Sequence, residues 1–288
     1  MLGLCPACAG VFRKELPEPP IPPLPPPRPV STVQTSRRFL VSPSEPRTDA
    51  LRMLAEAAAR SKRKNVAYAR EFVRDSSMAL PATPLVRLIQ GGRGGAVRLR
   101  LYLLLTMIAT QHPFDIRNPR TTRTIARTLC LSRTGPRLVK DNLRWLEKNG
   151  FIAQTPRPGQ TASIQLLDPL RSGAVMPDPR SNRPYLTIPI GFWSQGWLLA
   201  LSPVADVVLF ALGEALGGAK GPRYLTPTRR ASYHMSHDTW TKGEAELADH
   251  GLLSVDRTLR GDDWDHWRLR NVYQLDLGLL ATPVSHWS

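Results

Sequence analysis

A helix expected between Pro136 and Asn149 is the feature that most constrains how this chain folds. Ser132 and Thr134 have side chains that suit a helix N-cap, and Pro136 fits the first helical position because its fixed φ is already helical. Apolar residues follow at helical spacing, and Asn149-Gly150 is a typical helix stop. The sequence therefore predicts a helix with a defined start and a defined end.

The two faces of this helix differ in chemistry. At about 100° per residue, one side carries the apolar residues Leu138, Val139, Trp145 and Leu146. The opposite side carries four cations and one acid: Arg137, Lys140, Asp141, Arg144 and Lys148. A helix fits the major groove of B-DNA, where Arg and Lys donate to guanine and neighbouring cations neutralise phosphates. A solvated basic helix is the alternative, and the flanking elements favour the DNA interpretation.

The elements expected around this helix are those of a winged helix-turn-helix. A long apolar helix at residues 96–110 and a short helix at 122–129 precede it, and residues 151–155 and 162–166 predict a β-hairpin, the wing, after it. A wing arginine beside a groove-bound helix commonly meets phosphate or the adjacent minor groove. We therefore predict DNA contacts from the helix, the turn before it and the wing tip: Arg133, Thr134, Arg137, Lys140, Arg144, Lys148 and Arg157.

The charge of the chain indicates a polyanionic partner and the part of the chain that binds it. The net charge is +16 over 288 residues. Residues 1–95 carry +8, residues 96–180 carry +9 and residues 181–288 carry −1. A basic balance alone does not separate nucleic acid from a membrane surface or a ribosome. It places the expected docking surface in the first two thirds of the chain.

The C-terminal third repeats the order of elements. A long apolar helix is expected at residues 201–216, two further helices at 226–234 and 238–250, and a second hairpin from strands at 252–259 and 266–275. The outward residues of the last helix are Asp238, Lys242, Ala245 and Asp249. This face has two acids and one base, so phosphate would repel it. A structural or protein-contact role is therefore the preferred interpretation of this copy, and a DNA-binding role is the alternative.

Two helix segments, GPRLVKDNLRWLEKNGFI and HDTWTKGEAELADHGLL, are each followed by a hairpin. Across residues 96–277 the chain resembles the tandem winged-helix proteins found among bacterial transcription regulators and plasmid or phage replication initiators. The resemblance implies duplex DNA binding through the last helix of a copy and its wing, and initiators typically use both copies. The acidic second helix departs from that pattern and favours a regulator.

The N-terminal third is expected to lie outside the two winged helices. Residues 1–49 predict a disordered proline-rich tail, because Pro lacks the N–H group that regular structure requires. Residues 50–95 predict a basic helical arm and a glycine-rich hinge, in which Lys62, Arg63 and Lys64 either contact DNA or belong to a solvated helix. Residues 96–180 are the expected basic domain, and residues 181–288 are the expected near-neutral domain.

No residue pattern indicates catalysis, a metal or another cofactor. Cys5-Pro-Ala-Cys8 lacks the second ligand pair of a zinc ribbon, and His234 and His237 lack a third ligand at a useful spacing. Ser-His-Asp, P-loop and paired-carboxylate arrangements do not stand out, so an enzyme is not expected. Three cysteines fit a reducing cytoplasm, and the sequence shows no convincing signal peptide or membrane span.

The expected fold is mainly α with small β-hairpin wings, an α+β class with two tandem winged helix-turn-helix domains. The expected function is that of a cytoplasmic, nucleoid-associated protein that binds double-stranded DNA, with a transcription regulator as first choice. A replication initiator of a plasmid, phage or integrative element is the alternative, and a protein-binding structural adaptor is an alternative of another class. The second winged helix is the expected site of a homodimer or protein contact, and no membrane partner is expected.

Overall fold

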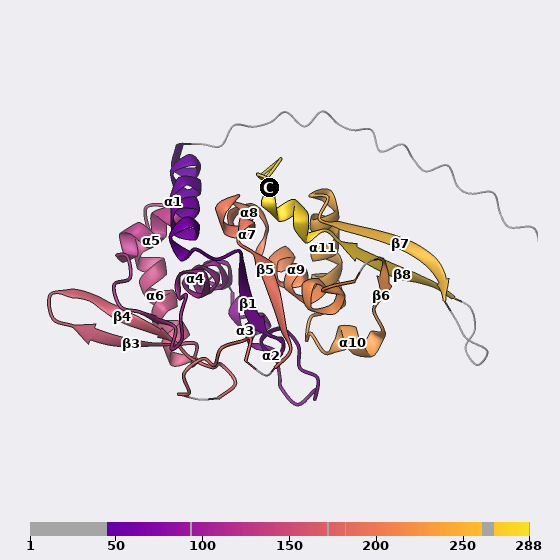
Figure 1. Ribbon diagram of the computed structural model, residues 1–288, viewed down its shortest axis with the longest axis horizontal. Coiled ribbons are helices and arrows are strands. Elements are labelled where there is room, and N and C mark those ends of the chain that lie inside the picture. Colours follow the sequence, from indigo (N-terminus) through magenta and orange to yellow (C-terminus); the bar gives the residue numbers. More distant parts are fainter. Residues whose placement is uncertain are drawn as a thin grey trace, which may run out of the picture. The chain divides into compact units, whose positions relative to one another are not determined.

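The structure, a computed structural model, describes residues 45–288 except 93, 172, 182, 220, 261–267 and 288. Its class is α+β, with helices and small antiparallel sheets, and two long hairpins extend away from the helices (Figure 1). The disorder expected of residues 1–44 lies outside the described residues. Residues 45–49, expected to belong to the same tail, instead form the start of a helix.

Residues 45–108 contain the elements α1 (Glu45–Ser61), β1 (Asn65–Ala69), α2 (Arg70–Val73), α3 (Pro84–Ile89) and α4 (Gly95–Ile108). α4 is apolar around most of its circumference, which is the pattern of a helix buried in a core. It contacts α1, α3, α6 and α9. The long apolar helix expected at residues 96–110 is thus confirmed, and it is the central support of this half of the fold.

Five further elements complete this half: β2 (Asp115–Ile116), α5 (Thr122–Thr128), α6 (Gly135–Lys148), β3 (Ile152–Arg157) and β4 (Gln160–Leu166). The strands form one antiparallel sheet in the order β2-β4-β3. Thr121 caps α5 by accepting a hydrogen bond from the Thr124 N–H at 3.2 Å. α6 ends at Lys148 with Asn149 as its C-cap, and Gly150 follows with a φ of +76°, as the helix stop predicts. Both helices and the hairpin are confirmed, whereas β2 was not expected.

The C-terminal half contains β5 (Tyr185–Pro189), α7 (Gly191–Ser194), α8 (Trp197–Ala200), α9 (Pro203–Leu216), β6 (Arg223–Tyr224), α10 (Pro227–Ala231), α11 (His237–Asp249), β7 (Leu253–Arg260), β8 (Arg268–Leu275) and the 3-10 helix η1 (Leu277–Ala281). Its three-stranded antiparallel sheet has the order β6-β8-β7. Ser202, Thr226 and Ser236 cap α9, α10 and α11 with their side chains. The helices and hairpin expected here are confirmed within a few residues.

The two halves repeat one another over more of the chain than the sequence pattern indicated. The order β1-α2-α3-α4-β2-α5-α6-β3-β4 corresponds, element by element, to β5-α7-α8-α9-β6-α10-α11-β7-β8. The three-stranded sheets β2-β4-β3 and β6-β8-β7 have the same strand order. The repeat therefore starts at β1 and β5, upstream of the long helices where the sequence placed it.

Residues 50–95 do not form the separate arm that was expected. Ala50, Leu54 and Ala58 of α1 are buried, and α1 contacts α5 and α7. β1 pairs antiparallel with β5 from Asn65↔Pro189 to Ala69↔Tyr185, so this segment joins one repeat to the other. The apolar residues of α1 thus form the side of the helix that faces the core. The described residues belong to one compact unit with one continuous hydrophobic core.

Buried polar groups also connect the repeats. Arg100 of α4 donates from Nη2 to the carbonyl oxygens of Leu199 and Leu201, at 3.2 and 3.0 Å. The buried Glu214 carboxylate of α9 accepts hydrogen bonds from Arg229 and lies 3.4 Å from Nε of Arg70 in α2. Because such groups are costly to leave unpaired, these contacts hold the two repeats in one arrangement.

Candidate nucleic-acid interface

α6 is held against α4 and α5 by one apolar face. Val139, Leu143 and Leu146 are buried on that face. A Cβ atom at Gly135 would lie 2.8 Å from Leu131 Cβ and 2.9 Å from Ala126 Cβ, so the first turn of α6 approaches α5 as closely as only glycine allows. This contact fixes the direction in which α6 presents its other face.

Two residues at the edge of the buried face differ from the helical-wheel expectation. Leu138 was expected to face inward, but it is 37% exposed, because it lies roughly 80° from the centre of the buried arc. Asn142 is buried in its place, and its side-chain amide donates to the Leu138 carbonyl at 2.8 Å. Trp145 is half-buried beneath the guanidinium of Arg98, whose Cζ lies 3.7 Å from the ring centroid.

The outward face of α6 carries the charged residues that the sequence assigned to it. Arg137, Lys140, Asp141, Arg144 and Lys148, here called the α6 stripe, are all exposed. The side chains of Arg137 and Arg144 are 88% and 65% exposed. Asp141 lies 3.8 Å from each of them, at Arg137 Nε and Arg144 Nη1. Surface pairs of this kind contribute little energy, so both guanidinium groups remain accessible and the stripe has a net charge of +3.

The turn before α6 adds Arg133 and Thr134, both of which are exposed. Thr134 occupies the N-cap position, but its side chain caps no backbone N–H and its backbone is already helical. Its hydroxyl lies 3.2 Å from the Ser132 hydroxyl instead. The side-chain cap expected from Ser132 or Thr134 is therefore wrong. The Gly135 N–H donates to the Ser132 carbonyl at 2.7 Å instead, and the N–H groups of Arg137 and Leu138 donate to the Thr134 carbonyl at 3.1 and 3.2 Å.

Arg157 does not project from the hairpin tip as expected. It is the last residue of β3, and Nη1 donates to the Arg117 carbonyl at 2.6 Å and to Asn118 Oδ1 at 2.8 Å. These bonds tie the hairpin to the loop after β2. Arg157 is half-buried, so its position favours a role in orienting the hairpin.

Of the three basic residues expected in the arm, only two are exposed. Lys62 and Lys64 face solvent. Arg63 donates from Nη1 to the Thr106 carbonyl at 3.2 Å and from Nη2 to the Ala109 carbonyl at 2.8 Å. It therefore satisfies carbonyls at the end of α4, and burial lowers the pKa of its guanidinium. Neither a solvated side chain nor a guanidinium free for DNA, the two alternatives expected here, describes Arg63 with these internal hydrogen bonds.

A second group of exposed arginines precedes α6 and was missed. Arg117 and Arg120 are exposed between β2 and α5, and Arg123 is exposed on α5. Arg127 of α5 pairs with Asp49 of α1 at 2.9 Å. α5 contacts α6, so Arg123 and Arg127 lie on the helix next to the one that carries the α6 stripe. The signal was present in the sequence, since arginine recurs every three or four residues from 120 to 127.

The chain matches no protein-family model, no curated protein and no solved structure. Within the described ranges, no group of three or more His, Cys, Asp or Glu side chains is placed to hold a metal ion. The helices in the same ranges are all too short or too polar to span a bilayer.

The corresponding helix of the second repeat presents a different surface. Asp238, Lys242, Ala245 and Asp249 of α11 are exposed as expected, while Trp240, Gly243 and Leu247 are buried. Lys242 Nζ lies 2.8 Å from Asp238 Oδ2, so an acid one turn away neutralises the single cation of this face. The face of α11 has a net charge of −1, against +3 for the α6 stripe.

Proposed function

We propose that this chain binds double-stranded DNA by inserting α6 into the major groove, and that it acts as a transcription regulator. The observation that carries the proposal is the α6 stripe, four exposed cations and one acid on the face opposite the buried one. From Arg137 to Lys148 the stripe is about 16 Å long, which is less than half a turn of B-DNA. Its cations can therefore reach base edges and the phosphates on either side of one groove.

The topology supports the same proposal. α5, the close turn at Gly135, α6 and the β3–β4 hairpin occur in the order of a winged helix-turn-helix, and β2 adds the third strand of its small sheet. We interpret each repeat as one such unit. In DNA-binding proteins of this type the last helix enters the groove and the hairpin meets the backbone beside it.

The charge of α11 supports one DNA-binding unit per chain. A groove-bound α11 would bring Asp238 and Asp249 towards phosphates, within the screening length of about 8–10 Å. The second candidate function, a replication initiator with two DNA-binding units, is favoured by the matching topology of the repeats. A cytoplasmic, nucleoid-associated location follows from a DNA partner in either case.

The second repeat has a feature that supports a protein contact. Leu259 and Leu269 face one another across β7 and β8 and are 58% and 64% exposed, and β7 is an edge strand. We propose a second copy of this chain as the partner there. Sedimentation at rising protein concentration tests it, with Leu259→Lys expected to leave only the monomer mass.

The proposed DNA contact is tested by duplex selection followed by anisotropy titration. A random 30-bp library selected with the full chain supplies the enriched duplex, and single-stranded DNA and RNA of the same length are the competitors. We expect Arg144→Ala to weaken binding by about 1–3 kcal/mol if the side chain reads a base, or to lower the salt slope by about 0.9 if it contacts a phosphate.

Lys242→Ala is the matched control, because it removes a cation from the equivalent helix. We expect it to leave the affinity and the salt slope unchanged. Equal losses from both substitutions would favour the two-unit initiator. Unchanged binding by Arg144→Ala, or a preference for single strands or RNA, would refute the proposal.

A further inference from the structure

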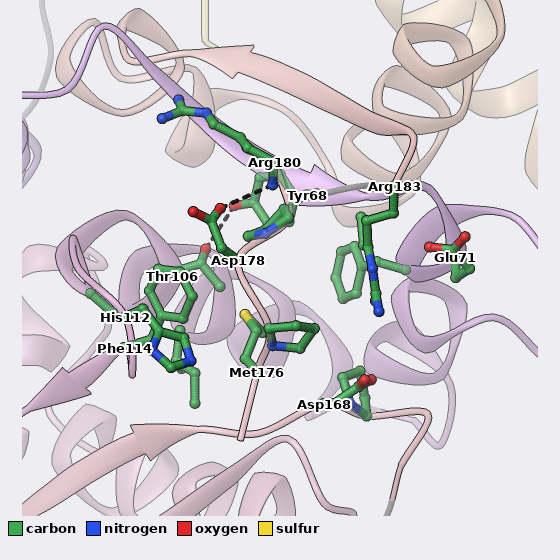
Figure 2. Close-up of a pocket in the computed structure, with 18 of the residues that line it drawn as sticks. Tyr68, Glu71, Thr106, His112, Phe114, Asp168, Met176, Asp178, Arg180 and Arg183 are labelled. Carbon is green, nitrogen blue, oxygen red and sulfur yellow. Dashed lines mark hydrogen bonds between the residues drawn. The ribbon is translucent and has the colours of Figure 1, made fainter. Parts of the chain in front are cut away.

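A cavity of about 250 Å³ lies away from the α6 stripe, between β1, α2, α4 and the chain that follows β4 (Figure 2). Its wall is completed by residues 109–112, in the loop after α4, and by residues 166, 168–170, 176–180 and 183. None of the residues of the α6 stripe lines it. A buried cavity of 150 Å³ accepts benzene, so this one has room for an aromatic ring and a short substituent.

The greater part of the wall is apolar and aromatic. Tyr68, Phe72, Tyr102, Phe114 and Met176 line it. Phe72 lies between Tyr68 and Tyr102, with ring centroids 5.4 and 5.5 Å away. Such a wall favours a planar ring, because aromatic rings gain from stacked and edge-on contacts as well as from burial.

Three of the charged side chains that line the cavity lie at one end of it, away from Asp178 and Arg180 (Figure 2). Glu71, Asp168 and Arg183 lie at that end, whereas His112 and Phe114 lie at the other (Figure 2). Glu71 Oε2 and the hydroxyl of the fully buried Tyr102 have no hydrogen-bond partner among the described residues. Buried polar atoms without partners are rare in folded proteins and mark places where a ligand or water completes the bonding.

Most of the other charged groups of the wall are already engaged, and Oδ1 of Asp168 accepts from the Leu170 N–H at 3.0 Å. Arg63 donates to the two carbonyls at the end of α4. Asp178 Oδ1 accepts from the backbone N–H of Arg180 at 2.9 Å, and Nη2 of Arg180 donates to the Asn65 carbonyl at 3.4 Å. The Tyr68 hydroxyl bonds with Thr106 Oγ1 at 2.7 Å. Arginines and carboxylates balance in the wall as a whole, three of each. A ligand without net charge therefore suits the cavity best.

We propose that the cavity binds a free aromatic α-amino acid. The ring lies among Tyr68, Phe72, Tyr102 and Phe114. Glu71 and Asp168 accept from the ammonium group, and Arg183 donates to the carboxylate. A zwitterion with an aromatic side chain is the simplest molecule that matches two carboxylates and one guanidinium at one end of an aromatic cavity. The inference does not depend on DNA binding.

Calorimetric titration of the full chain tests the proposal without DNA. The probes are L-tryptophan and L-phenylalanine, with tryptamine, indole-3-propionate and adenine as analogues. We expect at least one of the two amino acids to bind, and both indole analogues to bind at least about 10-fold more weakly than the preferred amino acid, because each lacks one charged group. Absence of binding by both amino acids, or tighter binding of adenine, overturns the proposal.

Substitutions assign the two charged groups. We expect Glu71→Gln and Arg183→Met each to weaken amino-acid binding by about 10-fold or more, while Glu56→Gln and Arg117→Met, exposed residues outside the cavity, leave it unchanged. Arg183→Met should not alter tryptamine binding, since tryptamine has no carboxylate. Equal affinities in all four variants overturn the proposal. If Glu71→Gln fails to fold, the analogue series on the unaltered chain decides.

Discussion

Asp141 is the single acid of the α6 stripe, and its removal offers the sharpest test of how this face works. Asp141→Asn keeps the shape of the side chain and raises the net charge of the stripe from +3 to +4. The Asp141 side chain is 52% exposed, and each of its two arginine partners is 3.8 Å away, which is long for an ion pair. Losing these two surface pairs therefore costs little stability. The substitution therefore changes the electrostatics of the surface while the fold stays intact.

The expected gain in affinity follows from counterion release. One additional unit of charge against phosphate adds about 0.9 to the slope of log K against log salt. If the variant and the unaltered chain bind equally well at 1 M salt, the steeper slope gives the variant an affinity about five-fold higher at 0.15 M salt. Freeing Arg137 and Arg144 from Asp141 acts in the same direction. Anisotropy of a labelled 30-bp duplex, titrated at several salt concentrations, measures both the affinity and the slope.

Asp249→Asn is the matched control, since it neutralises an exposed acid on the equivalent helix of the second repeat. We expect no change in duplex affinity from it. If Asp141→Asn leaves duplex affinity unchanged or lowers it, the α6 stripe does not face the phosphates and the argument from its charge is wrong. A gain from both substitutions would instead indicate that α6 and α11 both lie against DNA.

Two predictions concern stability. We expect Arg63→Met to lower the free energy of unfolding by about 1–3 kcal/mol, because the carbonyls of Thr106 and Ala109 lose their donor. The control is Lys62→Met, which replaces an exposed side chain and should have almost no effect. Equal urea midpoints for the two variants would contradict this prediction. Burial raises the pKa of the Asp206 carboxyl well above 3.8, so the folded chain keeps a proton that the unfolded chain releases, and stability falls as the pH rises above about 4. Asp206→Asn should remove this contribution, and its advantage over the unaltered chain in urea unfolding should grow from pH 4 to pH 8; an advantage independent of pH would refute the assignment.

The local sequence pattern was sufficient to predict most of the helices and which residues of α6 and α11 face outward. Caps and stops such as Thr121, Ser202 and Gly150 act over three or four residues, so their effect is visible in the sequence. The 3.6-residue period likewise placed Arg144 outward and Val139 inward. It failed at the edge of the buried arc, at Leu138 and Asn142, where the neighbouring helices decide how far the core extends.

Long-range contacts decided the remaining features. Arg63 and Arg157 are of a residue type common in DNA-binding surfaces, but both guanidinium groups bind other parts of the chain. The partners of Arg63 lie 43 and 46 positions away, and those of Arg157 lie 40 and 39 positions away. The two-residue strands β2 and β6 are too short to give a periodic signal and exist because β4 and β8 supply their hydrogen bonds.

The sequence by itself determined the order of the helices and hairpins, the basic character of the first repeat and the acidic face of α11, because these depend on neighbours one or two turns away. Only the tertiary structure decided that α1 and β1 belong to the core and that β1 joins β5. It alone placed Glu71, Asp168 and Arg183 around one cavity. Those features depend on pairing and burial between segments about 100 residues apart, for which a single sequence contains no periodic signal.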